Sequence, residues 1–222
     1  WLEDARNAGV AFVQISPIKD DMADDLGATW LPARPSTDVA IMLGLAHTLL
    51  TEGLQDDAFL ARYCTGFEIF RGYVMGARDG IAKDADWAAA ISGLDAGTIR
   101  DLARRMAADR TMISVSYSVQ RGDHGEQPCW MAATLAAMLG QIGLPGGGFG
   151  IGYGSNGLIG KPSPQVPQPG LPMGSNPTGA YIPVARVVDA LLNPGAPYDF
   201  NGERRTYPDL RMIYWCGGNP FH

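Results

Sequence analysis

A dense group of hydrogen-bonding side chains occupies one short stretch of this sequence and comprises Gln120, Arg121, His124, Glu126 and Gln127. The stretch follows an alternation of apolar and small polar residues at 112–119, which predicts a strand, and precedes an apolar helix predicted at 126–142. Ligands of open α/β sheets bind at the carboxyl ends of strands, and a helix start offers free backbone N–H groups to anions. We therefore predict a binding site here.

Arg121 and His124 are the residues of this stretch best suited to chemistry. The guanidinium of Arg121 is a fixed fork of donors that suits phosphate, a carbonyl or another polarised oxygen. His124 can carry a proton or donate a hydrogen bond. The alternative is a surface turn in which Arg121 pairs with Asp123 or Glu126, and the sequence leaves both interpretations open.

Two further turns carry groups suited to a nucleotide. After a strand predicted at 10–16, the hydroxyl of Ser16 can reach a ribose, although a Ser-Pro pair is more often a simple turn. Further along, the carboxylate of Asp38 can accept two hydrogen bonds from the Watson–Crick edge of guanine. The alternative is that Ser36 or Thr37 caps the following helix and that Asp38 is a favourable charge in its first turn.

Helical and strand patterns alternate along the chain. Helices are predicted at 1–9, 37–52, 98–108, 126–142 and 183–192, shorter ones near 59–64, 69–75 and 87–91, and strands at 10–16, 112–119 and 210–216. This alternation predicts an α/β fold with a mainly parallel sheet and helices on both faces. We expect Asp95 to cap a helix and His47, inside another helix, to have a structural role.

A Gly/Pro-rich loop is expected to divide the chain. We predict an α/β dinucleotide-binding-like domain at 1–142, this loop at 143–180, and at 181–222 a helix and a strand that complete the sheet or lead into a neighbouring domain. A loop of this length is either functional or disordered. Its glycine run at 146–154 follows a helix rather than a strand, so a segment draped over a bound cofactor fits better than a dinucleotide fingerprint.

The composition excludes several classes of function. A net charge of −6 over 222 residues argues against a non-specific nucleic-acid binder. No apolar run reaches the ~18 residues that span a bilayer, and no signal peptide is recognised. The three cysteines are widely spaced and no residues show metal-ligand spacing, so we expect free thiols in a reduced compartment and no metal held by this chain alone. The chain reads as a piece of a longer protein.

Three longer motifs resemble those of the dimethyl sulfoxide reductase family, which includes dimethyl sulfoxide, trimethylamine N-oxide and biotin sulfoxide reductases. They are RPSTDVAIMLGLAHTLLTEGL at 34–54, SVQRGDHGEQPCWMAATLAAMLGQIGLPGGGFGIGYG at 118–154 and RRTYPDLRMIYWCGGNPFH at 204–222. The resemblance implies an interior domain of a bacterial enzyme that reduces S-oxides or N-oxides by oxygen-atom transfer. Its molybdenum would be held by two molybdopterin guanine dinucleotides, the bis(molybdopterin guanine dinucleotide) form.

The resemblance also implies partners and a compartment. The partners would be the remaining domains of the same polypeptide, a small S-oxide or N-oxide substrate and an electron donor that the sequence does not identify. We expect no nucleic acid, no membrane span, and a location in the cytoplasm or periplasm, with the cytoplasm favoured. The alternative is a non-catalytic structural or electron-transfer module of the same fold in a larger complex.

Site residues follow from the matching positions. The resemblance implies cofactor contacts at Ile15, Ser16, Ser36, Thr37, Asp38, Tyr117, Ser118, Arg121, Gly218, Asn219 and His222, of which Arg121 is also the expected catalytic residue. The segment 36–38 would contact guanosine, Tyr117, Ser118 and Arg121 would lie near the pterin, and the last three residues would contact the other dinucleotide. The serine ligand of molybdenum would lie upstream, so we expect the isolated chain neither to retain molybdenum nor to reduce substrate.

Overall fold

The computed structural model describes residues 2–152, 170, 172, 174–176 and 181–216. The chain divides into a first unit, residues 1–164, and a second unit, residues 165–222. The division falls inside the segment 143–180 that the sequence analysis assigns to a loop.

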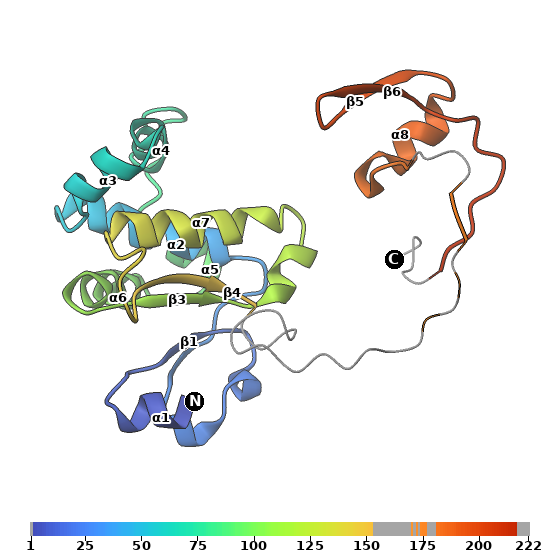
Figure 1. Cartoon of the computed structure of the whole chain (residues 1–222). Helices are drawn as coiled ribbons and strands as arrows, with labels where there is room; N and C mark the ends of the chain where they lie inside the picture. Colours follow the sequence, from blue (N-terminus) through green and yellow to red (C-terminus); the bar gives the residue numbers. More distant parts are fainter. Residues whose placement is uncertain (1, 153–169, 171, 173, 177–180, 217–222) are drawn as a thin grey trace. The chain divides into compact units, whose positions relative to one another are not determined.

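The first unit combines helices with short strands (Figure 1). In chain order its elements are α1 (Leu2–Asn7), β1 (Val13–Ile15), the 3-10 helices η1 (Lys19–Asp21) and η2 (Asp24–Leu26), β2 (Thr29–Leu31), α2 (Asp38–Thr51), α3 (Asp57–Tyr63), α4 (Phe67–Val74), α5 (Ala85–Ser92), α6 (Ala96–Ala108), β3 (Met112–Val115), the 3-10 helix η3 (Tyr117–Arg121), α7 (Glu126–Met138) and β4 (Gly148–Ile151). The helices expected near 59–64, 69–75, 87–91 and 98–108 are confirmed as α3 to α6. Asp95 caps α6 as predicted, because its Oδ2 accepts from the N–H of Thr98 at 2.8 Å.

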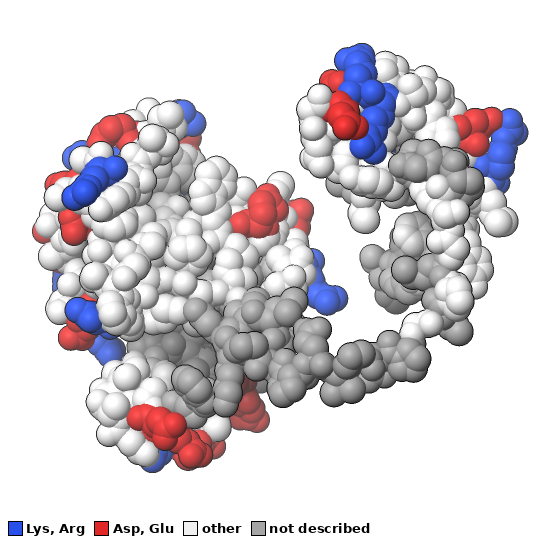
Figure 2. Space-filling view, in the orientation of Figure 1, with Lys and Arg blue, Asp and Glu red and all other residues white. Residues whose placement is uncertain are grey.

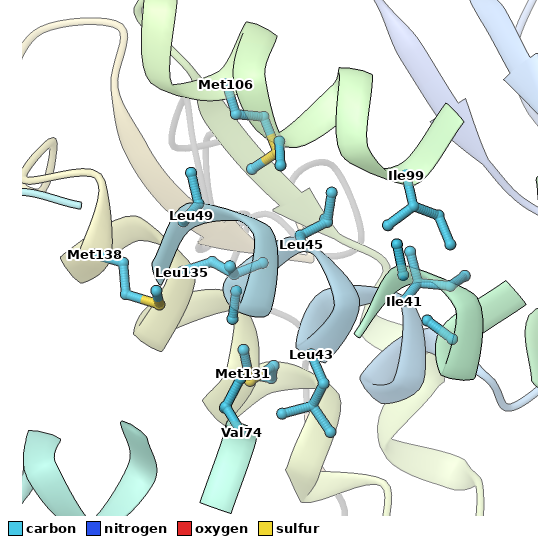
Figure 3. Close-up of a cluster of buried hydrophobic side chains, with 14 of the residues drawn as sticks. Ile41, Leu43, Leu45, Leu49, Val74, Ile99, Met106, Met131, Leu135 and Met138 are labelled. Carbon is cyan, nitrogen blue, oxygen red and sulfur yellow. The ribbon is translucent and has the colours of Figure 1, made fainter. Parts of the chain in front are cut away.

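Helix α2 lies at the centre of the hydrophobic core. It packs against α5, α6 and α7, and most of its residues from Ala40 to Leu49 are buried. Figure 3 shows its apolar side chains among those of α4, α6 and α7, with Ile41, Leu43, Leu45 and Leu49 on α2 and Val74, Ile99, Met106, Met131, Leu135 and Met138 around them. A helix that is apolar around its circumference is buried from all sides. The position of α2 is therefore fixed by its contacts with several helices rather than by a single helix–helix interface.

Gly44 allows α2 and α5 to approach each other closely. A Cβ atom at this position would lie 2.7 Å from the Cβ of Ala88 and 3.3 Å from Cγ2 of Ile99. Close-packed interiors have no spare volume for such an atom. The spacing of the two helices therefore depends on the missing side chain.

Two parallel strand pairs confirm the α/β class in the first unit. Strands β1 and β2 pair with Val13 opposite Thr29, and β3 and β4 pair with Met112 opposite Gly148. Parallel pairs need a long crossover, and in the second pair α7 provides it. Within the described residues the two pairs remain separate two-stranded sheets and do not join into one larger sheet.

The strand predicted at 112–119 is shorter than expected, because β3 ends at Val115 and η3 follows. The Oγ of Ser116 accepts a hydrogen bond from the N–H of Ser118 at 3.3 Å. Serine hydroxyls that bond the backbone two residues on form turns. The alternation of apolar and polar residues thus continues past the point where local hydrogen bonding ends the strand.

The glycine-rich segment after α7 contains strand β4, so the prediction of an irregular loop is wrong at Gly148–Ile151. Glycine gives no alternation of side chains, so the strand has no pattern to detect. The helix predicted at 126–142 also ends earlier, at Met138, and Gly140 follows with a φ of +66°. Gln141 then donates to the carbonyl of Asp109 at 2.9 Å, which holds the chain beside β3.

The second unit contains η4 (Val184–Arg186), α8 (Val187–Leu192) and the antiparallel hairpin β5 (Pro197–Phe200) and β6 (Glu203–Thr206). The helix predicted at 183–192 is confirmed as η4 with α8, whereas the strand predicted at 210–216 is wrong. Residues 211–216 are exposed and have no regular structure. The sequence analysis missed the hairpin, although its turn is Asn201-Gly202, with φ values of +50° and +78°. An Asn-Gly pair between strands is a strong hairpin signal.

Uncharged residues form much of the visible surface of each unit (Figure 2). This agrees with a charged content of 18%, which is below the usual ~25%. Among residues 2–152 and 181–216, no helix is both long enough and apolar enough to cross a bilayer.

Two glycine substitutions test the packing of α2. We expect Gly44→Ala to lower the free energy of unfolding by about 1–2 kcal/mol, because overpacking outweighs the gain in helix propensity. The control is Gly72→Ala in α4, where the new Cβ would meet its nearest atom, the Cβ of Ala77, at 3.9 Å. That variant should be roughly 0.5–1 kcal/mol more stable. Urea denaturation measures the free energy of unfolding of both variants. If both substitutions changed it in the same direction, the packing argument would be wrong.

Candidate functional site

The turns that carry most of the predicted site residues follow the carboxyl ends of β1, β2 and β3. Strands β1 and β2 are parallel and adjacent, so their ends meet at one edge. The N–H of Ser16, just after β1, donates to the carbonyl of Leu31, the last residue of β2, at 3.3 Å. The Ser16 turn and the segment leading to Asp38 therefore start side by side.

The turn before α2 also lies close to the turn after β3. A Cβ atom on Gly122 would lie 3.9 Å from the Oγ of Ser36, which is ordinary van der Waals contact. Helices α2 and α7, which these two turns precede, pack together along their lengths. The structure thus brings the turns of Asp38 and Arg121 next to each other, although they are far apart in the sequence.

Both of these turns contain a residue with left-handed backbone conformation. Ser36 has a φ of +60° and His124 a φ of +53°. Such conformations cost about 1–3 kcal/mol each in a non-glycine residue and cluster at functional sites. The strain is consistent with turns shaped to hold side chains in particular positions.

Arg121 is exposed at the end of η3 and forms no ion pair with any residue in the described part of the chain. The alternative in which it pairs with Asp123 or Glu126 is therefore not realised. Those carboxylates lie nearer to His124, with Asp123 Oδ1 3.9 Å from its Nε2 and Glu126 Oε1 4.0 Å from its Nδ1. The guanidinium of Arg121 is left available for a ligand.

Glu126 is the first residue of α7 and points its charge at the helix start. Its own backbone N–H, the side chain of Gln127 and the nearby His124 together lower the pKa of its carboxyl. Glu126 is therefore ionised near neutral pH. It balances the partial positive charge of the helix start, so an anionic ligand would compete with it.

Asp38 is half-buried at the start of α2 and has no hydrogen bond to a residue that the structure describes. The predicted cap is not formed, because neither Ser36 nor Thr37 bonds a free N–H of the helix. Thr37 Oγ1 instead donates backwards to the carbonyl of Arg34 at 2.6 Å. The carboxylate of Asp38 keeps its acceptor capacity.

Ser16 uses its hydroxyl within its own turn. The Oγ hydrogen-bonds the carboxylate of Asp21 and accepts from the N–H of Ile18 at 3.1 Å. The indole of Trp30 donates to the carbonyl of Ser16 at 2.9 Å. The sequence analysis missed Asp21 and Trp30 as organisers of this turn. Ile15, the last residue of β1, is exposed beside them.

Tyr117 and Ser118 lie in η3 and are exposed. The ring of Tyr117 lies against Gly152, where a Cβ atom would come within 2.7 Å of its Cδ2. The N–H of Gly152 donates to the carbonyl of Val115 at 3.0 Å, so the chain leaving β4 passes directly over η3. Gly152 is a further residue that the sequence analysis missed, and its φ of +68° explains why glycine is needed there.

Three predicted contacts, Gly218, Asn219 and His222, lie outside the described residues. His47, expected to be structural, is half-buried in α2, and burial lowers the pKa of its imidazole. Within the described ranges, His, Cys, Asp and Glu form no group of three that could hold a metal ion.

An apolar hollow of about 630 Å³ lies elsewhere in the first unit and is lined by Phe59, Tyr63, Cys64, Gly140, Ile142, Gly143 and Leu144. These residues come from α3 and from the chain beyond the end of α7, whereas Arg121 precedes the start of α7. The hollow has no charged side chain in its lining. It does not belong to the polar turns described above.

The family model described as molybdopterin oxidoreductase matches residues 3–222. Over 214 residues the chain is 52% identical to biotin sulfoxide reductase from Cereibacter sphaeroides, covering 96% of this chain and 29% of the relative. It is 48% identical to dimethyl sulfoxide/trimethylamine N-oxide reductase from Rhodobacter capsulatus, covering 99% and 28%.

A third relative, trimethylamine-N-oxide reductase 1 from Escherichia coli strain K12, is 45% identical over 227 residues, covering 96% of this chain and 27% of the relative. The chain therefore spans less than a third of the length of the relatives it matches.

Two neighbouring glycines test how tightly the turn after β3 is built. A Cβ atom on Gly125 would lie 2.7 Å from the Cα of Gln120 and closer still to its carbonyl oxygen. We expect Gly125→Ala to lower the free energy of unfolding by about 1–3 kcal/mol, because backbone atoms cannot move aside cheaply. Gly122 has an ordinary φ of −73°, and a Cβ atom there would lie 3.6 Å from the carbonyl oxygen of Val119, an ordinary contact, so Gly122→Ala should change stability by less than about 0.5 kcal/mol. Comparable losses in urea denaturation would refute this description of the turn.

Proposed function

This chain belongs to the molybdopterin oxidoreductase family, and from that premise we propose that its first unit binds a guanine dinucleotide form of the molybdopterin cofactor. The enzyme of which it would form the cofactor-binding part reduces S-oxides or N-oxides. The relatives named above, which carry these activities in their names, support the substrate class. The other domains of the enzyme would lie outside these 222 residues, and the substrate and the electron donor would be further partners.

One observation carries the proposal. The proximity of Ser36 to Gly122 brings together two turns that each hold a charged side chain without a partner in the described chain, Asp38 and Arg121. A guanine base presents N–H donors that suit a carboxylate, and a phosphate or pterin carbonyl presents oxygens that suit a guanidinium. The two turns therefore offer complementary groups for two parts of one ligand.

The surroundings of these turns fit such a ligand. Ser36, Gly122 and Ser118 are small, so a ligand can lie close to the backbone. The turn at Ser16 starts from the same edge and adds backbone groups and the carboxylate of Asp21. The contacts assigned to Ile15, Thr37 and Tyr117 remain predictions of this proposal, as do those of Gly218, Asn219 and His222.

The cofactor would supply the oxygen-atom transfer and the accompanying two-electron chemistry. The part assigned to this chain is binding and orientation. Arg121 would donate charge-assisted hydrogen bonds to the oxygen of the bound S-oxide or N-oxide as negative charge develops on it. No residue of this chain is proposed as a metal ligand.

Asp38→Asn tests the guanine site. The amide would keep one acceptor oxygen but place an NH₂ donor where guanine also has a donor, so we expect cofactor-free full-length protein to bind GMP about tenfold more weakly. Its preference for GMP over IMP, which lacks the 2-amino group, should fall to near one. Asp20→Asn, an exposed neighbour of the Ser16 turn, is the control and should keep the wild-type preference. Isothermal titration measures both, and an unchanged preference in Asp38→Asn would refute the guanine assignment.

Arg121→Lys separates orientation from cofactor loading. Lysine keeps the charge but loses the planar fork, so turnover of dimethyl sulfoxide or trimethylamine N-oxide should fall by about tenfold to a hundredfold. Molybdenum and GMP contents of the purified full-length enzyme should stay near wild type. Arg105→Lys on α6, also exposed and without a partner in the described chain, is the matched control. Equal losses of molybdenum and turnover would instead make Arg121 a cofactor anchor.

A further inference from the structure

The turn that carries Asp38 is attached to the end of α5 by Arg34. The backbone N–H of Arg34 donates to the carbonyl of Ser92 at 2.9 Å. Its Nη1 donates to the carbonyls of Ala90 at 3.0 Å and Ile91 at 3.1 Å. The last carbonyls of a helix lack intrahelical partners and carry the negative end of the helix dipole. A guanidinium is well suited to hold them.

The other side of Arg34 is bonded to the start of α2. Its carbonyl accepts from Thr37 Oγ1 at 2.6 Å. Between these two residues, Pro35 fixes its own φ and Ser36 adopts a left-handed conformation. Little backbone freedom remains between the end of α5 and Asp38, so the place of Asp38 depends on where Arg34 is held.

Gly93 leaves room for this attachment. It ends α5 in a left-handed conformation with a φ of +78°. A Cβ atom there would lie 3.3 Å from Nε and 3.6 Å from Cζ of Arg34. A side chain at Gly93 would therefore push against the guanidinium, which gives a second way to disturb the same contact without changing Arg34.

We infer that Arg34 is a positioning residue for base selection: by holding the turn 34–38 on the end of α5, it places the carboxylate of Asp38 for a guanine base. The inference rests on the proposed function, because it assigns to Arg34 a role in the guanine site proposed above. Arg34 itself does not touch the base. It acts through Asp38, and its effect is on selectivity.

The preference for GMP over IMP distinguishes positioning from general stability. Guanine offers N1–H and the 2-amino group to a carboxylate, whereas hypoxanthine offers N1–H alone. A well-placed carboxylate therefore gives a preference of about tenfold for GMP. A substitution that merely loosens the protein weakens the binding of GMP and IMP alike and leaves the ratio of their affinities unchanged. A displaced carboxylate lowers that ratio.

The experiment measures GMP and IMP binding by isothermal titration to full-length protein from cells that cannot make molybdopterin. The variants are Arg34→Gln, Gly93→Ala, Asp38→Asn and the double variant Arg34→Gln/Asp38→Asn. We expect the first two to lower the GMP:IMP ratio to within about twofold of that of Asp38→Asn. The double variant should show no further loss, because two residues acting through one contact are not additive.

Two controls match these changes. Arg110→Gln removes another exposed guanidinium that donates to a loop carbonyl, that of Pro145 at 3.0 Å. Gly53→Ala introduces the same left-handed strain at the end of α2, with a φ of +65° and no atom within 4 Å of the new Cβ. Both controls should keep the wild-type ratio, and thermal denaturation shows whether each variant is folded.

The outcomes separate the two ideas. If Asp38→Asn abolishes the preference while Arg34→Gln and Gly93→Ala keep it, the positioning role is wrong and the guanine site stands. If the wild-type protein shows no preference, or Asp38→Asn keeps it, the guanine site is wrong and the positioning role falls with it. Should Arg34→Gln fail to fold, Gly93→Ala against Gly53→Ala decides the question.

Discussion

The burial of α2 on all sides is the constraint on which the rest of the first unit depends. The helix contacts α5, α6 and α7, and Gly44 sets its distance from α5. Because it is enclosed, α2 cannot slide or rotate without breaking several interfaces at once. The start of the helix therefore has a fixed origin, and the exact place of the Asp38 carboxylate there depends on the preceding segment, which Arg34 holds. The same packing places the start of α7, and hence the turn after β3, beside that origin.

Helices with a clear apolar period were predictable from the sequence, whereas strands that depend on pairing with another strand were not. Helices α3 to α6 follow from their apolar spacing and the cap at Asp95. Strand β4 was hidden because Gly148 and Gly150 carry no side chains to alternate, and it is a strand only because β3 pairs with it. At 210–216, by contrast, β-forming residues predicted a strand where the structure has none, since no neighbouring strand pairs there.

The candidate site shows the same division. The residue types and the strand-to-helix turns pointed to Ser36, Asp38 and Arg121 without any coordinates. That Ser36 lies near Gly122 could not be predicted from the sequence, because the two residues are brought together by the packing of α2 against α7. The sequence could not show that Ser36 and Thr37 leave α2 uncapped, or that Arg121 has no ion pair with the residues the structure describes, since spacing alone allows both a cap and an ion pair.

The pairing of β4 with β3 ties the turn of Arg121 to the glycine-rich segment that follows α7. Everything between these strands, including η3 and α7, forms one crossover that closes only when Gly148–Ile151 docks beside Met112–Val115. Gly152, just beyond β4, also lies against the ring of Tyr117 in η3. A substitution that unpairs β4 from β3 would therefore release both ends of this crossover, and the turn of Arg121 would lose its support although none of its own residues had changed.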